Sequence, residues 1–160
     1  MRLVSRQRLS YRLNPTVVVA ALVVTAIDAV TKAWARTVLA DHDVHVAGAV
    51  WLRLQYNSGI SFSINRSGSF VTTVVTTVVA LIVALFGLNA SPGVAAAGFG
   101  LLLGGGVANV IDRLAAVPHR VTDFIALGSF PVFNLADVAI TSGFVVLVVA
   151  AIQGERIVGR

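Results

Sequence analysis

The chain lacks cysteine altogether, and charged side chains are scarce in it. Without a thiol, disulfide bonds, thiolate metal sites and a cysteine nucleophile are all excluded. Charged residues make up 12% of the 160 residues, whereas hydrophobic residues make up 57%. A soluble globular domain carries roughly twice that share of charge, so the composition indicates an integral membrane protein. The length suits one compact domain, residues 1–160, and would be cramped for two.

Acidic residues are fewer than basic ones, which leaves a net charge of +5. The arginines do not form a stripe interleaved with aromatic residues, so the charge does not indicate nucleic-acid binding. Their concentration near both ends places both termini in the cytoplasm by the positive-inside rule. Although other arginines fall on the opposite side, the density at the N-terminus decides the orientation. The terminal arginines are Arg2, Arg6, Arg8, Arg12, Arg156 and Arg160.

Four apolar runs are long enough, or nearly so, to cross ~30 Å of hydrocarbon at ~20 residues each. They cover about residues 16–35, 70–88, 94–114 and 133–152. The turn at residues 89–93 is too short for anything but an antiparallel hairpin between the second and third runs. We therefore predict an all-α membrane protein with four transmembrane helices, plus a small extracytoplasmic segment that is β-rich or amphipathic.

The first run also has features of a secretory signal. Arginine-rich residues 1–15, the apolar core Val17–Ile27 and the sequence Ala33-Trp34-Ala35 fit a signal with a cleavage site. However, Asp28 and Lys32 interrupt the region between core and cleavage site, and that region is long. We expect the run to remain as a transmembrane helix.

The outer segment after the first run alternates between apolar and polar residues. Leu52, Leu54 and Tyr56 are separated by polar side chains, and the alternation resumes from residue 60 to residue 65. This period predicts two short half-buried strands around Asn57-Ser58-Gly59. A turn by itself accounts for Asn57 and Gly59, and contact with a substrate is the alternative.

Polar residues from separate runs gather at one level of the membrane. Asp28 lies about 12 residues into its run, or roughly 18 Å along a helix, which places it in the outer leaflet. The inner halves of the runs contain no acid, which argues against an ion-coupled transporter, whose acids would be distributed through the membrane. A non-catalytic assembly subunit is a further alternative. The gathered residues are Asp28, Lys32, Asn57, Asn109, Asp112, Arg113, Asp123, Asn134 and Asp137.

Spacing suggests roles for the polar residues of the first and third runs. Asp28 and Lys32 are four residues apart, which favours an ion pair that only supports the helix. Asn109, Asp112 and Arg113 share one helical face. Either Asp112 and Arg113 cap the helix, or Arg113 holds a carboxylate or a substrate carbonyl group while Asn109 donates hydrogen bonds.

For two further sets of residues we predict no chemical role. Gly100 and Gly104 form a small-xxx-small pair, which predicts close helix packing. His42 and His45 flank Asp43, but neither they nor His119 form a credible set of metal ligands, so we expect no metal site.

Asp123 and Asp137 are the candidates for chemistry. The sequence Asn134-Leu-Ala-Asp137 predicts a helix N-cap with an acid three residues later. The segment between the two aspartates contains Gly128 and Pro131 and is long enough to fold back. Two carboxyl groups brought together at low dielectric would share a proton. One would then deprotonate a water molecule while the other protonates a scissile carbonyl oxygen, without a serine or cysteine nucleophile.

Five segments, in the same order along the chain, resemble the lipoprotein signal peptidase family, also called signal peptidase II. Members of this family are bacterial aspartic proteases with four transmembrane spans. They are D-A-V-T-K (28–32), N-S-G-I-S-F (57–62), G-G-G-V-A-N-V-I-D-R (104–113), V-T-D-F-I (121–125) and F-N-L-A-D (133–137). The resemblance implies that Asp123 and Asp137 are the catalytic dyad. It further implies contacts to the substrate or support of the site by Asn57, Gly59, Asn109, Arg113, Asn134, Asp28, Lys32 and Asp112.

The resemblance also implies the substrate, a prolipoprotein cut just before a cysteine that carries a diacylglyceryl group. It implies a multi-pass protein of the cytoplasmic membrane, in contact with lipids, with its site at the outer face. No cofactor and no nucleic acid are implied, and we expect a monomer. The chain departs from the family pattern at Ile60, Ser61 and Ala108, and its link from Asp123 to Asp137 is short.

Overall fold

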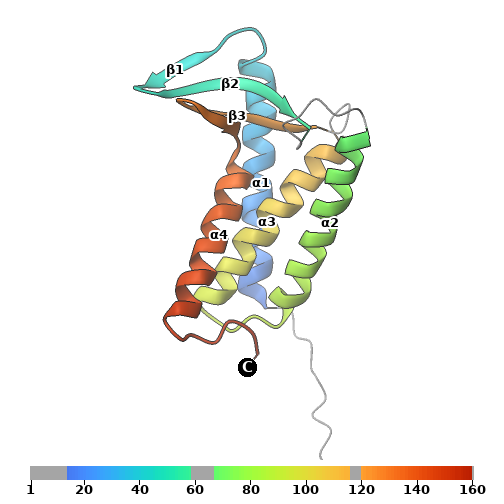
Figure 1. Ribbon diagram of the computed structural model, residues 1–160, viewed down its shortest axis with the longest axis vertical. Helices are drawn as coiled ribbons and strands as arrows, with labels where there is room; N and C mark the ends of the chain where they lie inside the picture. The colour runs from blue at the N-terminus through green and yellow to red at the C-terminus, as the bar shows by residue number, and fades with distance from the viewer. Residues whose placement is uncertain (1–13, 59–66, 116–119, 160) are drawn as a thin grey trace, which may run out of the picture.

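The structure consists of four long helices and a small sheet at one end of them (Figure 1). The computed structural model describes residues 14–58, 67–115 and 120–159. Each helix contains a stretch that is long and apolar enough to cross a membrane, so the predicted fold class is confirmed. The helices are α1 (Pro15–Val38), α2 (Ser67–Leu88), α3 (Val94–Ala115) and α4 (Leu135–Ile152).

The helix α3 is central and packs against each of the other three (Figure 1). Of its apolar stretch, 56% is buried inside the protein, against 17% in α1 and in α2 and 22% in α4. The outer three helices therefore expose apolar side chains over most of their surface. Helices that are apolar all round are typical of membrane spans.

Glycines let the neighbours of α3 approach it closely. A Cβ atom on Gly100 would lie 2.5 Å from the Cβ of Ala20, and one on Gly104 would lie 2.7 Å from a side-chain carbon of α1. On the side facing α4, a Cβ atom on Gly105 would overlap the backbone oxygen of Ala136. The predicted close packing through Gly100 and Gly104 is confirmed. It draws the polar residues of α1, α3 and α4 toward one another.

The sheet lies at the end of the helices opposite the C-terminus (Figure 1). Its strands are antiparallel and follow the order β1 (Val44–Ala47), β2 (Val50–Asn57), β3 (Val121–Leu127) and β4 (Phe130–Phe133). The pairing of β2 with β3 joins the segment after α1 to the segment after α3. In that pairing Gln55 lies opposite Asp123, so the sheet places one candidate aspartate beside the end of β2.

The strands agree with the sequence prediction only in part. The strand predicted around Leu52 and Leu54 is confirmed as β2, but Tyr56, predicted on its buried side, is 43% exposed. The burial of β2 alternates from Val50 to Gln55, and the alternation ends at Tyr56. The sequence did not predict β4, and α4 consequently begins at Leu135 rather than near residue 133. The strand predicted after residue 59, and Gly59 itself, lie outside the described residues.

Candidate active site

The two candidate aspartates come from neighbouring elements that a hairpin folds together. Asp123 lies within β3, and Asp137 lies in the first turn of α4. Between them the chain reverses at Gly128, which has a φ of +53° and donates its N–H to the Ala49 oxygen at 2.9 Å. A positive φ is readily adopted by glycine alone. The reversal pairs Phe133 with β3, so the first residue after β4 lies next to Asp123.

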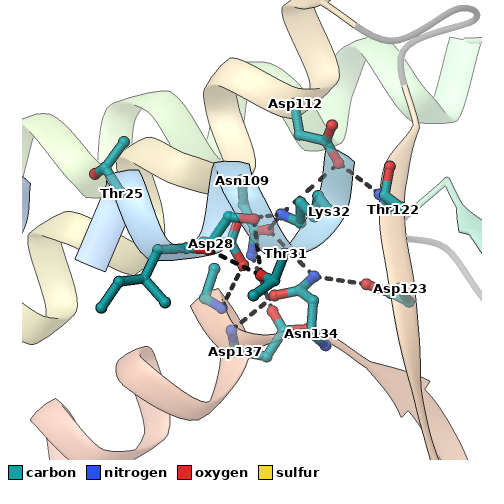
Figure 2. Close-up of polar contacts among 12 residues, drawn as sticks. Thr25, Asp28, Thr31, Lys32, Asn109, Asp112, Thr122, Asp123, Asn134 and Asp137 are labelled. Carbon is teal, nitrogen blue, oxygen red and sulfur yellow. Dashed lines mark hydrogen bonds and ion pairs between the residues drawn. The ribbon is translucent and has the colours of Figure 1, made fainter. Parts of the chain in front are cut away.

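That residue, Asn134, is fully buried and bonds to both aspartates (Figure 2). Its Nδ2 donates to Oδ1 of Asp123 at 2.6 Å, and its Oδ1 accepts from the backbone N–H of Asp137 at 3.0 Å. The backbone N–H of Asn134 in turn donates to Oδ2 of Asp137 at 3.2 Å. The predicted N-cap is therefore confirmed, with Asp137 completing a capping box. One asparagine side chain thus fixes the two acids relative to each other.

Each aspartate also accepts a hydrogen bond from a second asparagine. Asn57, the last residue of β2, donates its Nδ2 to Oδ2 of Asp123 at 3.0 Å. Asn109 of α3 donates its Nδ2 to Oδ1 of Asp137 at 2.9 Å. Neutral amide donors orient a carboxyl group without placing an opposite charge beside it.

Burial raises the pKa of Asp123 to about 6, from an ordinary value of 3.8. The hydrogen bonds from Asn57 and Asn134 lower this pKa, while the negative charge of Asp137 raises it further. The side chain of Asp123 is only 1% exposed, which explains why desolvation is the dominant cause. A carboxyl group whose pKa lies near neutrality is suited to general acid–base chemistry.

Behind the aspartates, Lys32 is the centre of a second buried network (Figure 2). Its ammonium group lies 2.7 Å from Oδ2 of Asp28 and 3.7 Å from Oδ2 of Asp112. It also donates to Oδ1 of Asn109 at 2.8 Å. Because an ammonium group only donates, it holds the oxygen of the Asn109 amide, and the NH₂ group is directed to Asp137.

The predicted pair of Asp28 and Lys32 is therefore present, and Asp28 has a further contact. Its Oδ1 accepts the backbone N–H of Ala136 at 2.8 Å. Acidic groups stabilise the start of a helix, where backbone N–H groups have no partner within the helix. Asp28 thus ties α1 to the first turn of α4, which carries Asp137.

Asp112 bonds to β3 and to an arginine that the sequence analysis did not select. Nη1 of Arg36 lies 3.0 Å from Oδ1 of Asp112 and donates to Oγ1 of Thr122 at 2.9 Å. Oδ2 of Asp112 accepts the backbone N–H of Thr122. These contacts hold β3 next to α3 one residue before Asp123. The position of Arg36, four residues after Lys32, is the signal that could have revealed it.

Arg113 lies in the same region, and its charge interacts with Asp112, Asp123 and Asp137. Its Nη1 also donates to the backbone oxygen of Asn109 at 3.4 Å. Every candidate site residue that the structure describes thus belongs to one connected region. Among the described residues, no group of three histidine or acidic side chains is arranged to hold a metal ion.

A groove of ≈ 540 Å³ opens beside the aspartates. Its walls are β4 and Asn57 on one side and one face of α4 on the other. Asp137 lines the groove, whereas Asp123 is buried behind it. The lining of this groove could not be predicted from the sequence, because it depends on the strand β4, which was not predicted. The α4 residues in the lining are Asp137, Val138, Thr141 and Ser142.

Residues 20–153 match the family model described as signal peptidase (SPase) II. The chain belongs to the signal peptidase II family. It is 35% identical over 149 residues to a lipoprotein signal peptidase of Mycobacterium leprae, covering 89% of this chain and 74% of that one. It is 36% identical over 149 residues to that of Gloeobacter violaceus, covering 89% and 84%.

Solved structures show the same fold. One bacterial membrane enzyme, determined by the in meso method, superposes with a TM-score of 0.72 at 22% identity, covering 89% of this chain and 90% of that one. A second has a TM-score of 0.67 at 24% identity, covering 89% and 96%. Membership of the family implies a protease, and together with the four apolar helices it indicates a bacterial integral membrane protein.

Proposed function

We propose that this protein is an aspartic endopeptidase that removes the signal peptide from diacylglyceryl-modified prolipoproteins. The cut falls just before the lipidated cysteine, and no cofactor takes part. The observation that supports this most strongly is the Asn134 side chain, which bonds to Asp123 and to the backbone of Asp137 beside an open groove. Membership of the signal peptidase II family supports the same substrate class.

In the proposed reaction the two carboxyl groups share one proton. The ionised group removes a proton from a water molecule, whose oxygen forms a bond to the scissile carbonyl carbon. The protonated group donates its proton to the carbonyl oxygen, so a neutral tetrahedral diol forms. The carbon–nitrogen bond then breaks as the ionised carboxyl group takes a proton from one diol hydroxyl group and the protonated one donates a proton to the leaving nitrogen. The products are a carboxylic acid and an amine, and the dyad again holds one shared proton. With its raised pKa, Asp123 is suited to carry the shared proton.

The proposed substrate suits the position of the groove. With both termini in the cytoplasm, the sheet and the dyad lie at the outer face of the membrane. A signal helix anchored by a lipid presents its scissile bond at that level, so the peptide reaches Asp137 without leaving the membrane. We propose that residues 1–160 form a single domain. We further propose that the protein is a monomer and contacts membrane lipids.

The test uses the purified protein with a diacylglyceryl-modified precursor and with the same precursor lacking the lipid. We expect cleavage of the modified form only. Asp123→Asn and Asp137→Asn should each lower the rate by at least about a hundredfold, because each removes a proton-transferring group. Asp41→Asn, at an exposed position, is the matched control and should cleave normally. Full activity of either dyad variant would refute the proposed function.

A further inference from the structure

Two hydroxyl groups line the groove one helical turn below Asp137. Thr141 and Ser142 are exposed there and follow Asp137 and Val138 at a spacing of four residues, on one face of α4. The adjacent Gly143 is buried against α3. The hydroxyl-bearing face is therefore turned away from the helix packing. Nothing in the family resemblance assigns a role to either residue.

These hydroxyl groups differ from others on the helices of this protein. Thr76 and Thr77 of α2 donate to the carbonyl oxygens four residues earlier, at 2.8 and 2.7 Å. Thr37 of α1 donates to the oxygen of Trp34, three residues earlier, at 2.8 Å. Within residues 14–58, 67–115 and 120–159, neither Thr141 nor Ser142 forms a side-chain hydrogen bond. Both hydroxyl groups thus remain available to a molecule in the groove.

We propose that Thr141 and Ser142 bind the backbone of the signal peptide where it unwinds ahead of the cleaved bond. This inference rests on the proposed function. A peptide bond must leave the helical conformation to be attacked, and unwinding frees backbone N–H and C=O groups. Hydrocarbon offers these groups no partner, so irregular backbone is tolerated at that depth only where protein supplies one.

The spacing along the groove fits this role. One helical turn separates Asp137 from Thr141, a rise of about 5.4 Å. An extended peptide advances about 3.3 Å per residue. The backbone groups about two residues before the scissile bond therefore reach the level of the two hydroxyl groups. A hydroxyl group both donates and accepts, so it can bind either an N–H or a C=O group.

Most of the other side chains that line the groove are apolar. Phe130, Val132 and Phe133 of β4 and Val138 of α4 present apolar side chains. These apolar side chains would contact substrate side chains but cannot form hydrogen bonds with the substrate backbone. Thr141 and Ser142 are consequently positioning residues, which hold the peptide so that the dyad can act on it.

The test compares the wild type with the double variant Thr141→Val and Ser142→Ala. The substrate is a synthetic lipidated precursor, made with either an amide or a backbone ester two residues before the cleaved bond. The ester lacks the N–H group and has a weaker acceptor. Loss of two hydrogen bonds should lower kcat/KM of the double variant about tenfold on the amide substrate. The ester should slow the wild type severalfold, yet cause little further loss in the double variant.

This lack of additivity separates a contact to the peptide backbone from a general structural effect, which would make the two losses add. The single variant Thr141→Ser keeps both hydroxyl groups and should retain most of the wild-type activity. Thr37→Val is a control that should behave as the wild type. The double variant should have the melting temperature of the wild type, because the two hydroxyl groups that it loses have no hydrogen-bond partner among the described residues. Equal kcat/KM of wild type and double variant, or an equal ester effect in both, would overturn the inference. Failure of the wild type to cleave the amide substrate would instead refute the proposed function, and this inference with it.

Discussion

Burial of Asp123 makes the stability of the protein depend on pH. Its pKa in the folded protein is raised to about 6, above the ordinary value of 3.8, so the folded state favours the protonated form. The resulting stability is fully present below about pH 4 and is lost as the pH rises through 6. A rise of the pKa from 3.8 to about 6 corresponds to a fall of about 3 kcal/mol in the free energy of unfolding between these two pH limits.

The variant Asp123→Asn removes the titrating group, so it tests the pH dependence. Its absolute stability also changes, because its NH₂ group replaces one of the two oxygens that accept hydrogen bonds from Asn57 and Asn134. For a chain of this length, about 3 kcal/mol corresponds to a shift in melting temperature of roughly 6–12 °C. We expect the wild type to lose stability by this amount between pH 4 and pH 7.5. Asp123→Asn should lose much less stability over the same pH range.

The assay is thermal unfolding in detergent micelles at several pH values, followed by tryptophan fluorescence. Trp34 is a suitable reporter, because its ring centroid lies 6.5 Å from that of Phe124, next to Asp123. Asp41→Asn removes an exposed carboxyl group and should follow the pH dependence of the wild type. If Asp123→Asn showed the same fall in melting temperature as the wild type, the assignment of the raised pKa to this burial would be wrong.

Four further variants, one of them a control, test other parts of the site. Lys32→Met removes the cation between two buried carboxylates and should cost about 3–5 kcal/mol of stability, measured as a lower melting temperature; an unchanged value would contradict the network. Gly105→Ala places a methyl group against a backbone oxygen of α4 and should destabilise by about 1–3 kcal/mol. Its neighbour Gly106→Ala meets only a side-chain carbon at 3.5 Å and should be tolerated. Asn57→Ala removes a hydrogen bond that lowers the pKa of Asp123, so Asp123 should keep the shared proton to higher pH and the basic limb of the pH–rate profile should move to higher pH.

Much of the scaffold could be predicted from the sequence because its determinants are local. An apolar run of sufficient length predicts a membrane helix wherever it lies, and all four runs are helices in the structure. The capping box at Asn134 and the ion pair of Asp28 and Lys32 involve residues three and four positions apart. Helical periodicity by itself brings such residues together, so no tertiary information is needed.

The sheet could not be predicted in full, since its strands depend on partners far away in the sequence. The strand β3 is buried on both faces over most of its length, so it lacks the alternation that marks a half-buried strand. The strand β4 is four residues long. Each exists because it pairs with a neighbour, and the groove exists because β4 and α4 diverge beside Asn57.

The sequence by itself determined which residue types gather at one level of the membrane, because helix length and orientation set that level. Only the tertiary structure decided how they connect. Asn134 bonds to Asp123 because the β3–β4 hairpin returns it there, and Lys32 orients Asn109 because small residues let α1 and α3 approach closely. Hydrogen bonds between separate elements depend on ångström-scale placement, which arises only when the whole chain packs.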